Sequence, residues 1–243
     1  MIAVRPTEYW PRPAYFALMD HVDHFVLADT FQYSRQSYQN RASLRTPNGR
    51  QWISIPLRGR QHGRPIHQVE IHGKHRWIRK HWRALTFNYR ATPFFEYYED
   101  QLRPVFDVEW EGLADLTSRT VEVTRDLLGI TTILSRASAL EGTPGTPGTR
   151  GTPGIPDTPP SPSTLEEILA TVGDENLVVP EIASSVDGTF AASVLDFEEV
   201  ERRQNFEGFE PGMSALDLLF NYGPEALSMI RKQALIHSAP RVP

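Results

Sequence analysis

The strongest hydrophobic pattern in the chain lies between Arg76 and Phe95, where bulky aromatic and basic residues share one stretch. Its apolar side chains recur three and four residues apart, which is the spacing of a helix with one buried face. They are Trp77, Ile78, Trp82, Leu85 and Tyr89. Pro93 stops the helix, because proline lacks a backbone N–H and restricts the residue before it. This stretch is therefore predicted to be an amphipathic helix packed on a core.

His81 is the titratable residue on that packed side, four residues after Trp77 and four before Leu85. Basic side chains spread over the flanks of the helix: Arg79, Lys80, Arg83 and Arg90. A histidine at the border of a core and a cationic surface is a candidate general base. The alternative is a core histidine with one satisfied hydrogen bond beside a solvated basic face.

Shorter patterns fill most of the remaining chain. Helical spacing predicts helices over residues 13–23, 93–110, 113–128, 164–172 and 214–232, the last one broken near Gly223-Pro224. Apolar or alternating runs predict strands over residues 24–28, 66–71, 130–134, 177–182 and 190–197, with Pro180 confining the fourth to a sheet edge at best. Asn48-Gly49 predicts a hairpin turn between residues 43–45 and 51–57. Residues 2–4 are too few to assign.

Helices alternate with short strands over most of this length, which favours an α/β fold over a helical bundle or a β-sandwich. We expect a single layered domain with a mixed sheet flanked by helices. Residues 142–163 differ, because Pro and Gly dominate them and apolar side chains are nearly absent. The domain is therefore predicted to consist of residues 1–141 and 164–243, interrupted by a flexible Pro/Gly-rich surface linker.

The composition is that of an ordinary globular protein, with 40% hydrophobic and 23% charged residues in a chain of 243. No apolar run approaches the roughly 20 residues that a membrane-spanning helix needs, and the N-terminal residues lack the pattern of a secretory signal. The absence of cysteine excludes disulfides, thiolate nucleophiles and cysteine metal sites. We expect a cytoplasmic protein without a membrane span.

Charge is distributed unevenly along the chain. Residues 1–103 carry 16 Lys and Arg against 8 Asp and Glu, whereas residues 104–243 carry 9 against 22. A basic first half suggests an anionic ligand such as a phosphate or a carboxylate. Two halves of one domain that pack against each other would give the same pattern. Nucleic acid is not expected as a partner, because the pI of about 5.9 is far from that of typical binders.

Asp29 and the loop 58–64 are further candidates for chemistry. Asp29 follows the predicted strand 24–28, and ligands of open α/β sheets bind outside the carboxyl ends of the strands. Asp29 would otherwise cap the following turn. Residues 58–64, RGRQHGR, are most simply a mobile loop. Their backbone amides and guanidinium groups offer a second interpretation, a loop that closes over an anion.

The common catalytic signatures are absent. The eight histidines include no HExxH motif, and His67, His72, His75 and His81 lack the spacing of a shared metal site. There is no GxSxG nucleophile elbow, dinucleotide fingerprint or Walker loop. We therefore expect a metal-independent protein, and these motifs leave its reaction open.

Five sequence blocks in a fixed order carry a family resemblance. They are LADTFQYSRQSYQNR, TPNGRQWISIPL, WIRKHWRALTFNYRATPFF, LGI and FEPGMSALDLLFNYGPEAL. Together they resemble the WbqC-like protein family over residues 1–135 and 195–232. The resemblance implies a bacterial-type biosynthetic protein, a transferase acting on amino sugars in the production of surface polysaccharides or specialised metabolites. By the same resemblance the matched site positions are Asp29, Gln32, Tyr33, Asn40, Arg41, Lys80, His81, Tyr89, Asp217 and Asn221.

The chain departs from the family pattern at two places. A His-Gln-Pro-like opening is replaced by Arg5, Pro6 and Thr7, so a histidine expected near the first strand is missing. A stretch resembling YLSG is replaced by LVVPEI at residues 177–182. The missing histidine would require a different catalytic base or a changed reaction. The altered stretch at residues 177–182 would allow a different choice of substrate.

The residues and the resemblance together favour an enzyme that transfers an acyl or aminoacyl group to an amine or hydroxyl of a small anionic or nucleotide-linked substrate. His81 would be the general base, and Asp29 would orient the base or the nucleophile. Lys80 and Arg41 would hold an anionic group or stabilise oxyanion charge. The other matched positions are candidates for substrate binding: Gln32, Tyr33, Asn40, Tyr89, Asp217 and Asn221.

No cofactor is evident, and an activated acyl or nucleotide-linked donor is the expected co-substrate. One alternative is a non-catalytic ligand-binding or scaffold protein of a biosynthetic cluster, which the missing histidine favours. Another is a hydrolase of a small anionic substrate, because transferases and hydrolases differ mainly in whether water is excluded. The sequence leaves open the donor, the acceptor and whether the chain forms a homodimer.

Overall fold

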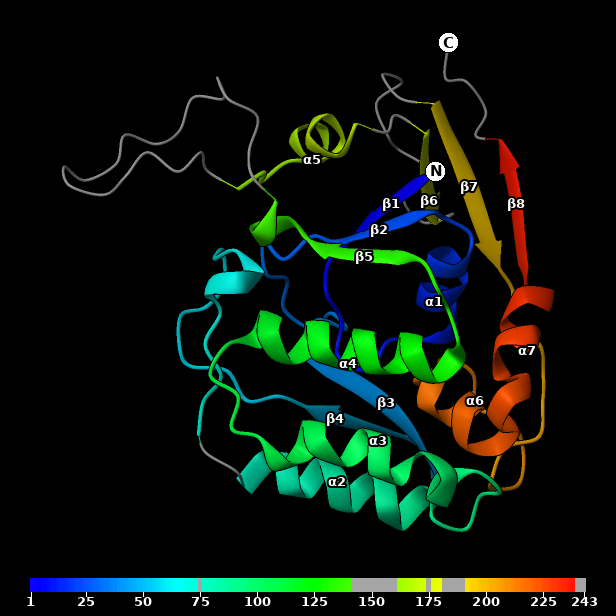
Figure 1. Cartoon of the computed structure of the whole chain (residues 1–243). Coiled ribbons are helices and arrows are strands. Elements are labelled where there is room, and N and C mark those ends of the chain that lie inside the picture. Colours follow the sequence, from blue (N-terminus) through cyan, green and yellow to red (C-terminus); the bar gives the residue numbers. More distant parts are fainter. Residues whose placement is uncertain (74–75, 141–160, 174–175, 181–190, 239–243) are drawn as a thin grey trace.

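A six-stranded mixed sheet forms the centre of the fold (Figure 1). The computed structural model describes residues 1–73, 76–140, 161–173, 176–180 and 191–238. The strands of the sheet are β1 (Ile2–Arg5), β2 (His24–Leu27), β5 (Ile133–Arg136), β6 (Asn176–Pro180), β7 (Ala191–Phe197) and β8 (Ala234–Ser238). They lie in the order β5-β2-β1-β6-β7-β8, and only the β7–β8 pair is antiparallel. The predicted α/β class with a mixed sheet is confirmed.

Helices and a separate hairpin surround this sheet. The α-helices are α1 (Pro13–Asp20), α2 (Arg76–Tyr89), α3 (Phe95–Asp107), α4 (Leu113–Leu128), α5 (Leu165–Val172), α6 (Ala215–Tyr222) and α7 (Ala226–Lys232). Short 3-10 turns are η1 (Ile66–Gln68), η2 (Ala137–Ala139) and η4 (Gly223–Glu225), and the hairpin consists of β3 (Arg41–Thr46) and β4 (Gly49–Ser54). No helix within the described residues is both long and apolar enough to cross a membrane.

Local signals explain where several helices begin and end. The Thr164 hydroxyl accepts a hydrogen bond from the Glu167 N–H, and the Glu167 carboxylate accepts one from the Thr164 N–H, which together form a capping box at the start of α5. Gly129 ends α4 with a φ of 76°, a left-handed conformation that glycine adopts without a Cβ clash. Both signals are short-range, so they could be predicted from sequence.

The large sheet buries a different set of side chains on each face. Along β2, Phe25 and Leu27 join the main core, whereas Val26 joins a smaller core with Ile168 and Leu169 of α5. Alternation along a strand produces this separation, because successive side chains point to opposite faces. Figure 1 shows α5 on one side of the sheet and α1 and α4 on the other.

The structure corrects two strand predictions. Residues 66–71 do not form a strand: Ile66–Gln68 make the η1 turn, because the His67 N–H donates to the Asp29 carbonyl at 2.8 Å and draws the segment inward. β6, predicted to be an edge strand at best, lies between β1 and β7. Pro180 is tolerated there because it is the last residue of β6, and only Leu177 pairs with β1.

Other differences are in the extent of the elements. β1 and β8 were not predicted, and β5 begins later than the predicted strand 130–134. Most of the predicted linker, residues 142–160, lies outside the described residues. Its last residues, 161–163, lie near the sheet, where the Pro162 carbonyl accepts a hydrogen bond from the Thr30 hydroxyl at 2.7 Å.

A buried ion pair joins α6 to the segment that precedes it. Arg202 Nη2 lies 2.9 Å from Asp217 Oδ2, and the two side chains are 3% and 0% exposed. Gln204 Nε2 donates to the same oxygen at 2.9 Å. Burial raises the pKa of Asp217, and the Arg202 charge opposes that shift. Removing one partner of such a pair leaves the other charge buried without compensation.

Arg202→Leu is expected to lower the free energy of unfolding by about 3–5 kcal/mol, because the Asp217 carboxylate then loses its buried cation. Urea unfolding followed by circular dichroism measures the change. Arg119 and Glu122, 47% and 38% exposed, form a control pair on the surface. Arg119→Ala should change stability by no more than about 0.5–1 kcal/mol. Equal losses in the two variants would contradict the role given to the buried pair.

Candidate functional site

The first of two adjoining cavities is lined by the segments that follow β2 and β4 in the chain. This arginine cavity has a volume of about 430 Å³, and no carboxylate is among the described residues that line it. Its guanidinium groups are those of Arg35, Arg41, Arg58 and Arg60. The predicted residues Tyr33 and Asn40 line the same cavity. A cavity with this lining suits a ligand that carries negative charge.

The backbone of the arginine cavity is strained at two positions. Gln36 and Arg60 both line it, with φ values of 58° and 61°. Residues other than glycine rarely adopt this left-handed conformation, and each instance costs about 1–3 kcal/mol. Strain of this kind is concentrated at binding and catalytic sites, where the surrounding structure holds it in place.

Arg41 is held in position on the cavity wall. Its guanidinium carbon lies 4.2 Å from the centre of the Trp52 ring, and its Nη2 donates to the Gln36 carbonyl. The buried Nε of Arg41 has no hydrogen-bond partner among the described residues. Beside it, Asn40 Nδ2 donates to the Ile55 carbonyl at 3.2 Å. A guanidinium fixed in this way loses little further freedom when it binds an anion.

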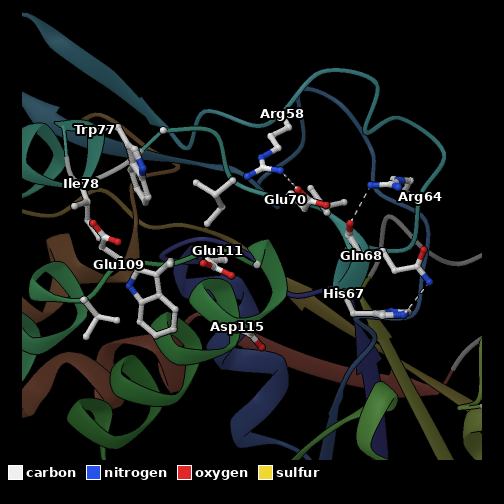
Figure 2. A pocket seen from close by; sticks show the side chains of 16 residues that line it. Arg58, Arg64, His67, Gln68, Glu70, Trp77, Ile78, Glu109, Glu111 and Asp115 are labelled. Atoms are coloured by element: carbon white, nitrogen blue, oxygen red, sulfur yellow. Dashed lines mark hydrogen bonds and ion pairs between the residues drawn. The ribbon is translucent and has the colours of Figure 1, made fainter.

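The second cavity, here called the acidic cavity, is larger, with a volume of about 730 Å³. Carboxylates and indole rings line it: Glu70, Glu109, Glu111, Asp115, Trp77 and Trp110. Figure 2 shows these carboxylates arranged around the opening, with Trp77 on one side and His67 and Arg64 on the other. The acidic side chains come from three parts of the chain, the segment after η1, the α3–α4 connection and the first turn of α4.

Arg58 lines both cavities and marks the boundary between them. Its Nη1 lies 2.6 Å from Glu70 Oε2, and the two side chains are 64% and 47% exposed (Figure 2). An exposed ion pair is weak, so it can exchange for contacts with a ligand at little cost in free energy. Arg58 therefore lies where the cationic lining of the arginine cavity borders the anionic lining of the acidic cavity.

Asp29, predicted to be catalytic, is fully buried at the carboxyl end of β2. Its carboxylate accepts hydrogen bonds from Arg136 Nε at 2.9 Å and from the Ser138 N–H at 2.8 Å. Arg136 also pairs with Asp115 of the acidic cavity at 2.7 Å. Asp29 thus lies behind the acidic cavity and supports its wall, and it lines neither cavity.

His81 lies behind one wall of each cavity. It is 6% exposed, and its Nδ1 lies 3.0 Å from the Tyr9 hydroxyl. Its ring packs edge-on against Trp77 of the acidic cavity, with 5.1 Å between ring centres. Burial lowers the pKa of His81 to about 4, and a hydrogen bond with the backbone of Ser54, which lines the arginine cavity, opposes that shift. The ring is therefore neutral at pH 7.

The amino-acid sequence of the chain is similar to that of a known protein family. A profile of the WbqC-like protein family matches residues 7–229. The chain belongs to the WbqC-like family. The "Uncharacterized protein Rv1507c" of Mycobacterium tuberculosis (strain ATCC 25618 / H37Rv) is 31% identical over 240 residues, which cover 95% of this chain and 97% of that relative. No solved structure matches.

The remaining predicted residues of this WbqC-like protein lie in separate places. Lys80 is exposed on α2, and Gln32 is exposed beside the arginine cavity, where it pairs with Pro65 in a β-bridge. Tyr89 and Asp217 belong to the buried region around Arg202, and Asn221 donates to the Asp217 carbonyl at 2.7 Å. The structure therefore brings together Tyr33, Asn40 and Arg41 in one cavity, and not the whole predicted set.

Sequence reasoning missed the acidic cavity of the WbqC-like protein. Its signal was the run Glu109-Trp110-Glu111 between two predicted helices, two acids that flank an indole in a short connection. Residues 58–64, for which the second interpretation was a loop that closes over an anion, contribute Arg58 and Arg60 to the lining of the arginine cavity, and anion binding by this loop stays a prediction. Within the described part of the chain, no group of three or more His, Asp or Glu side chains could hold a metal ion.

The low pKa of His81 makes stability depend on pH. The folded pKa is about 4 and the ordinary value is 6.5, so the unfolded chain binds a proton in this interval that the folded WbqC-like protein does not. The contribution of the neutral His81 ring to the free energy of unfolding is fully present above pH 6.5, and it is lost as the pH falls from 6.5 toward about 4. Between pH 7 and pH 4 we expect the wild type to lose roughly 3 kcal/mol more than His81→Gln.

Urea unfolding at several pH values measures this difference, and the His81→Gln variant subtracts the effect of all other titrating groups. A second outcome is expected at neutral pH, where His81→Gln should still unfold cooperatively because glutamine can keep one hydrogen bond with Tyr9 or Ser54. If the two proteins lose stability in parallel as the pH falls, His81 is not a buried neutral imidazole.

Proposed function

We propose that this WbqC-like protein is a group-transfer enzyme that holds an anionic donor in the arginine cavity and an acceptor in the acidic cavity. The observation that carries the proposal is that two cavities with linings of opposite charge meet at Arg58. A transferase needs donor and acceptor side by side, because holding both reactants in position removes much of the entropic barrier. A hydrolase needs only one organic substrate, so the second cavity favours transfer.

The arginine cavity fits a phosphate, diphosphate or carboxylate group. Guanidinium groups bind such anions through pairs of parallel hydrogen bonds, and Arg41 is already oriented by Trp52 and Gln36. The described residues that line this cavity include no carboxylate, and Glu70, which pairs with Arg58, lines the acidic cavity. A donor such as an acyl thioester of a nucleotide-containing carrier carries this anionic group at a distance from its reactive carbonyl carbon.

The acidic cavity fits an acceptor with an amine and hydroxyl groups. Carboxylates such as Glu109 and Glu111 accept hydrogen bonds from both groups and attract an ammonium ion, and Trp77 offers an apolar ring face. In the proposed step a lining carboxylate accepts one proton from the ammonium group, and the resulting amine attacks the carbonyl carbon of the donor and forms a new bond. The bond from that carbon to the leaving group breaks, and the leaving group takes its electron pair and the second proton of the nitrogen.

The catalytic assignments of His81, Lys80 and Asp29 stay predictions. The burial of His81 and its contacts with Ser54 and Trp77 favour a positioning role, because a group that lines neither cavity does not touch a ligand held there. The same observation favours a second candidate function, an anion-binding protein without turnover. The two functions differ in whether a product forms.

Mass spectrometry of reaction mixtures tests the proposed transfer. The purified protein is incubated with acyl-carrying nucleotide donors and with amino sugars such as glucosamine as acceptors, and the acceptor is expected to gain the mass of the transferred group. Glu111→Gln should lower the rate at least tenfold while the donor still binds. Donor binding without any acceptor product, or loss of the acyl group to water at the same rate with and without acceptor, would reject the transferase.

A calorimetric titration with uridine diphosphate or inorganic pyrophosphate tests the arginine cavity alone. Arg41→Ala is expected to weaken binding by about 1–3 kcal/mol, because a charge-assisted hydrogen bond to a fixed guanidinium is lost. Arg50→Ala is the matched control, since Arg50 lies on the same hairpin, pairs with Glu210 and lines neither cavity. The cavity assignment fails if the two substitutions weaken binding equally.

A further inference from the structure

A groove between α2 and α3 lies on a face of the molecule that neither cavity uses. It has a volume of about 640 Å³ and shares none of its described lining residues with the arginine or acidic cavity. Its lining includes Arg79, Trp82, Arg83, Thr86 and Phe87 of α2, and Arg90, the residue that follows the end of that helix. These positions recur three and four residues apart, so they form one stripe along the helix. Figure 1 shows α2 and α3 side by side, at the end of the molecule opposite α5.

The floor of this groove is apolar and aromatic. The rings of Trp82 and Phe106 contact each other with 5.0 Å between their centres. Trp82 is only partly buried, and Phe87 at the rim is 77% exposed. Such an exposed phenylalanine next to a partly buried indole leaves apolar surface in water, which is the usual mark of an interaction site.

The rim of the groove is cationic. Arg79 and Arg83 come from α2, and Arg90 follows directly after it. Arg103 comes from α3, and its guanidinium lies 5.0 Å from the Trp82 ring centre. The one carboxylate among the described lining residues is Asp107, which accepts two hydrogen bonds from Arg103 at 3.0 and 3.1 Å. The lining therefore has an excess of three positive charges around an aromatic floor.

We propose that this groove docks an acidic segment of a partner protein that inserts one large apolar side chain between α2 and α3. Charge complementarity selects the acidic residues, since arginine at a rim pairs well with carboxylates. The recessed aromatic floor selects the apolar side chain, because a buried anchor in a pocket supplies most of the affinity of such an interface. A bilayer surface would instead favour an apolar face that projects outward, and here only Phe87 does so.

A displayed library of random 12-residue peptides, selected against the immobilised full-length protein, tests the proposal. The expected result is enrichment of sequences in which Asp or Glu residues flank a Leu, Phe or Trp. A synthetic peptide of the enriched sequence should then bind at least tenfold more weakly to Arg83→Glu and to Phe87→Ser, as measured by fluorescence anisotropy. Replacing the apolar residue of the peptide by serine should have a similar effect.

Two variants provide matched controls outside the groove. Arg119→Glu reverses an exposed charge on α4, and Tyr97→Ser removes an aromatic side chain of α3 that is 66% exposed. Both should bind the peptide as the wild type does. The proposal is overturned by the absence of enrichment, by equal losses in the control variants, or by enrichment without acidic residues. It is also overturned if Phe87→Ser abolishes binding to phosphatidylglycerol vesicles, binding to duplex DNA or self-association while leaving peptide binding intact.

Discussion

The buried carboxylate of Asp29 is the constraint on which the arrangement of the candidate site depends. Its side chain fixes Arg136 at the end of β5 and Ser138 in η2, and its backbone carbonyl accepts hydrogen bonds from both the N–H and the ring of His67 in η1. Arg136 also forms an ion pair with Asp115 in the first turn of α4. One residue at a strand end therefore holds together the segments that form the wall of the acidic cavity, since a buried carboxylate must satisfy its oxygens with such donors.

The two neighbouring cavities have linings of opposite charge because different parts of the chain are folded around Asp29. The basic first part of the sequence supplies the arginine cavity, and the acidic α3–α4 connection faces it across the ion pair of Arg58 with Glu70. Within a folded protein, charges of one sign gathered around a cavity raise the local concentration of ligands with the other sign. The uneven charge along the sequence thus gives two cavities whose linings carry opposite charge, and it also gives ion pairs between the two halves, such as Arg50 with Glu210.

Sequence alone was informative where the signals are local and uninformative where they depend on distant partners. The extent of α4 could be predicted from its period and from Gly129. Tyr33, Asn40 and Arg41, which line one cavity, were candidates through the family resemblance, since their own local pattern does not mark a site. The position of Pro180 within the sheet depends on strands far away in the chain, which no local pattern encodes. Likewise, no local pattern near Asp217 indicates that its side chain is buried in an ion pair with Arg202.

A crystal structure of the protein with uridine diphosphate and glucosamine tests whether the two cavities hold two ligands at once. Diphosphate oxygens are expected within hydrogen-bond distance of Arg41 in the arginine cavity. The amine of glucosamine is expected beside Glu109 or Glu111 in the acidic cavity, with both molecules present together. Both ligands in one cavity, or density for either ligand only at sites outside the two cavities, would show that the cavities do not hold a donor and an acceptor side by side.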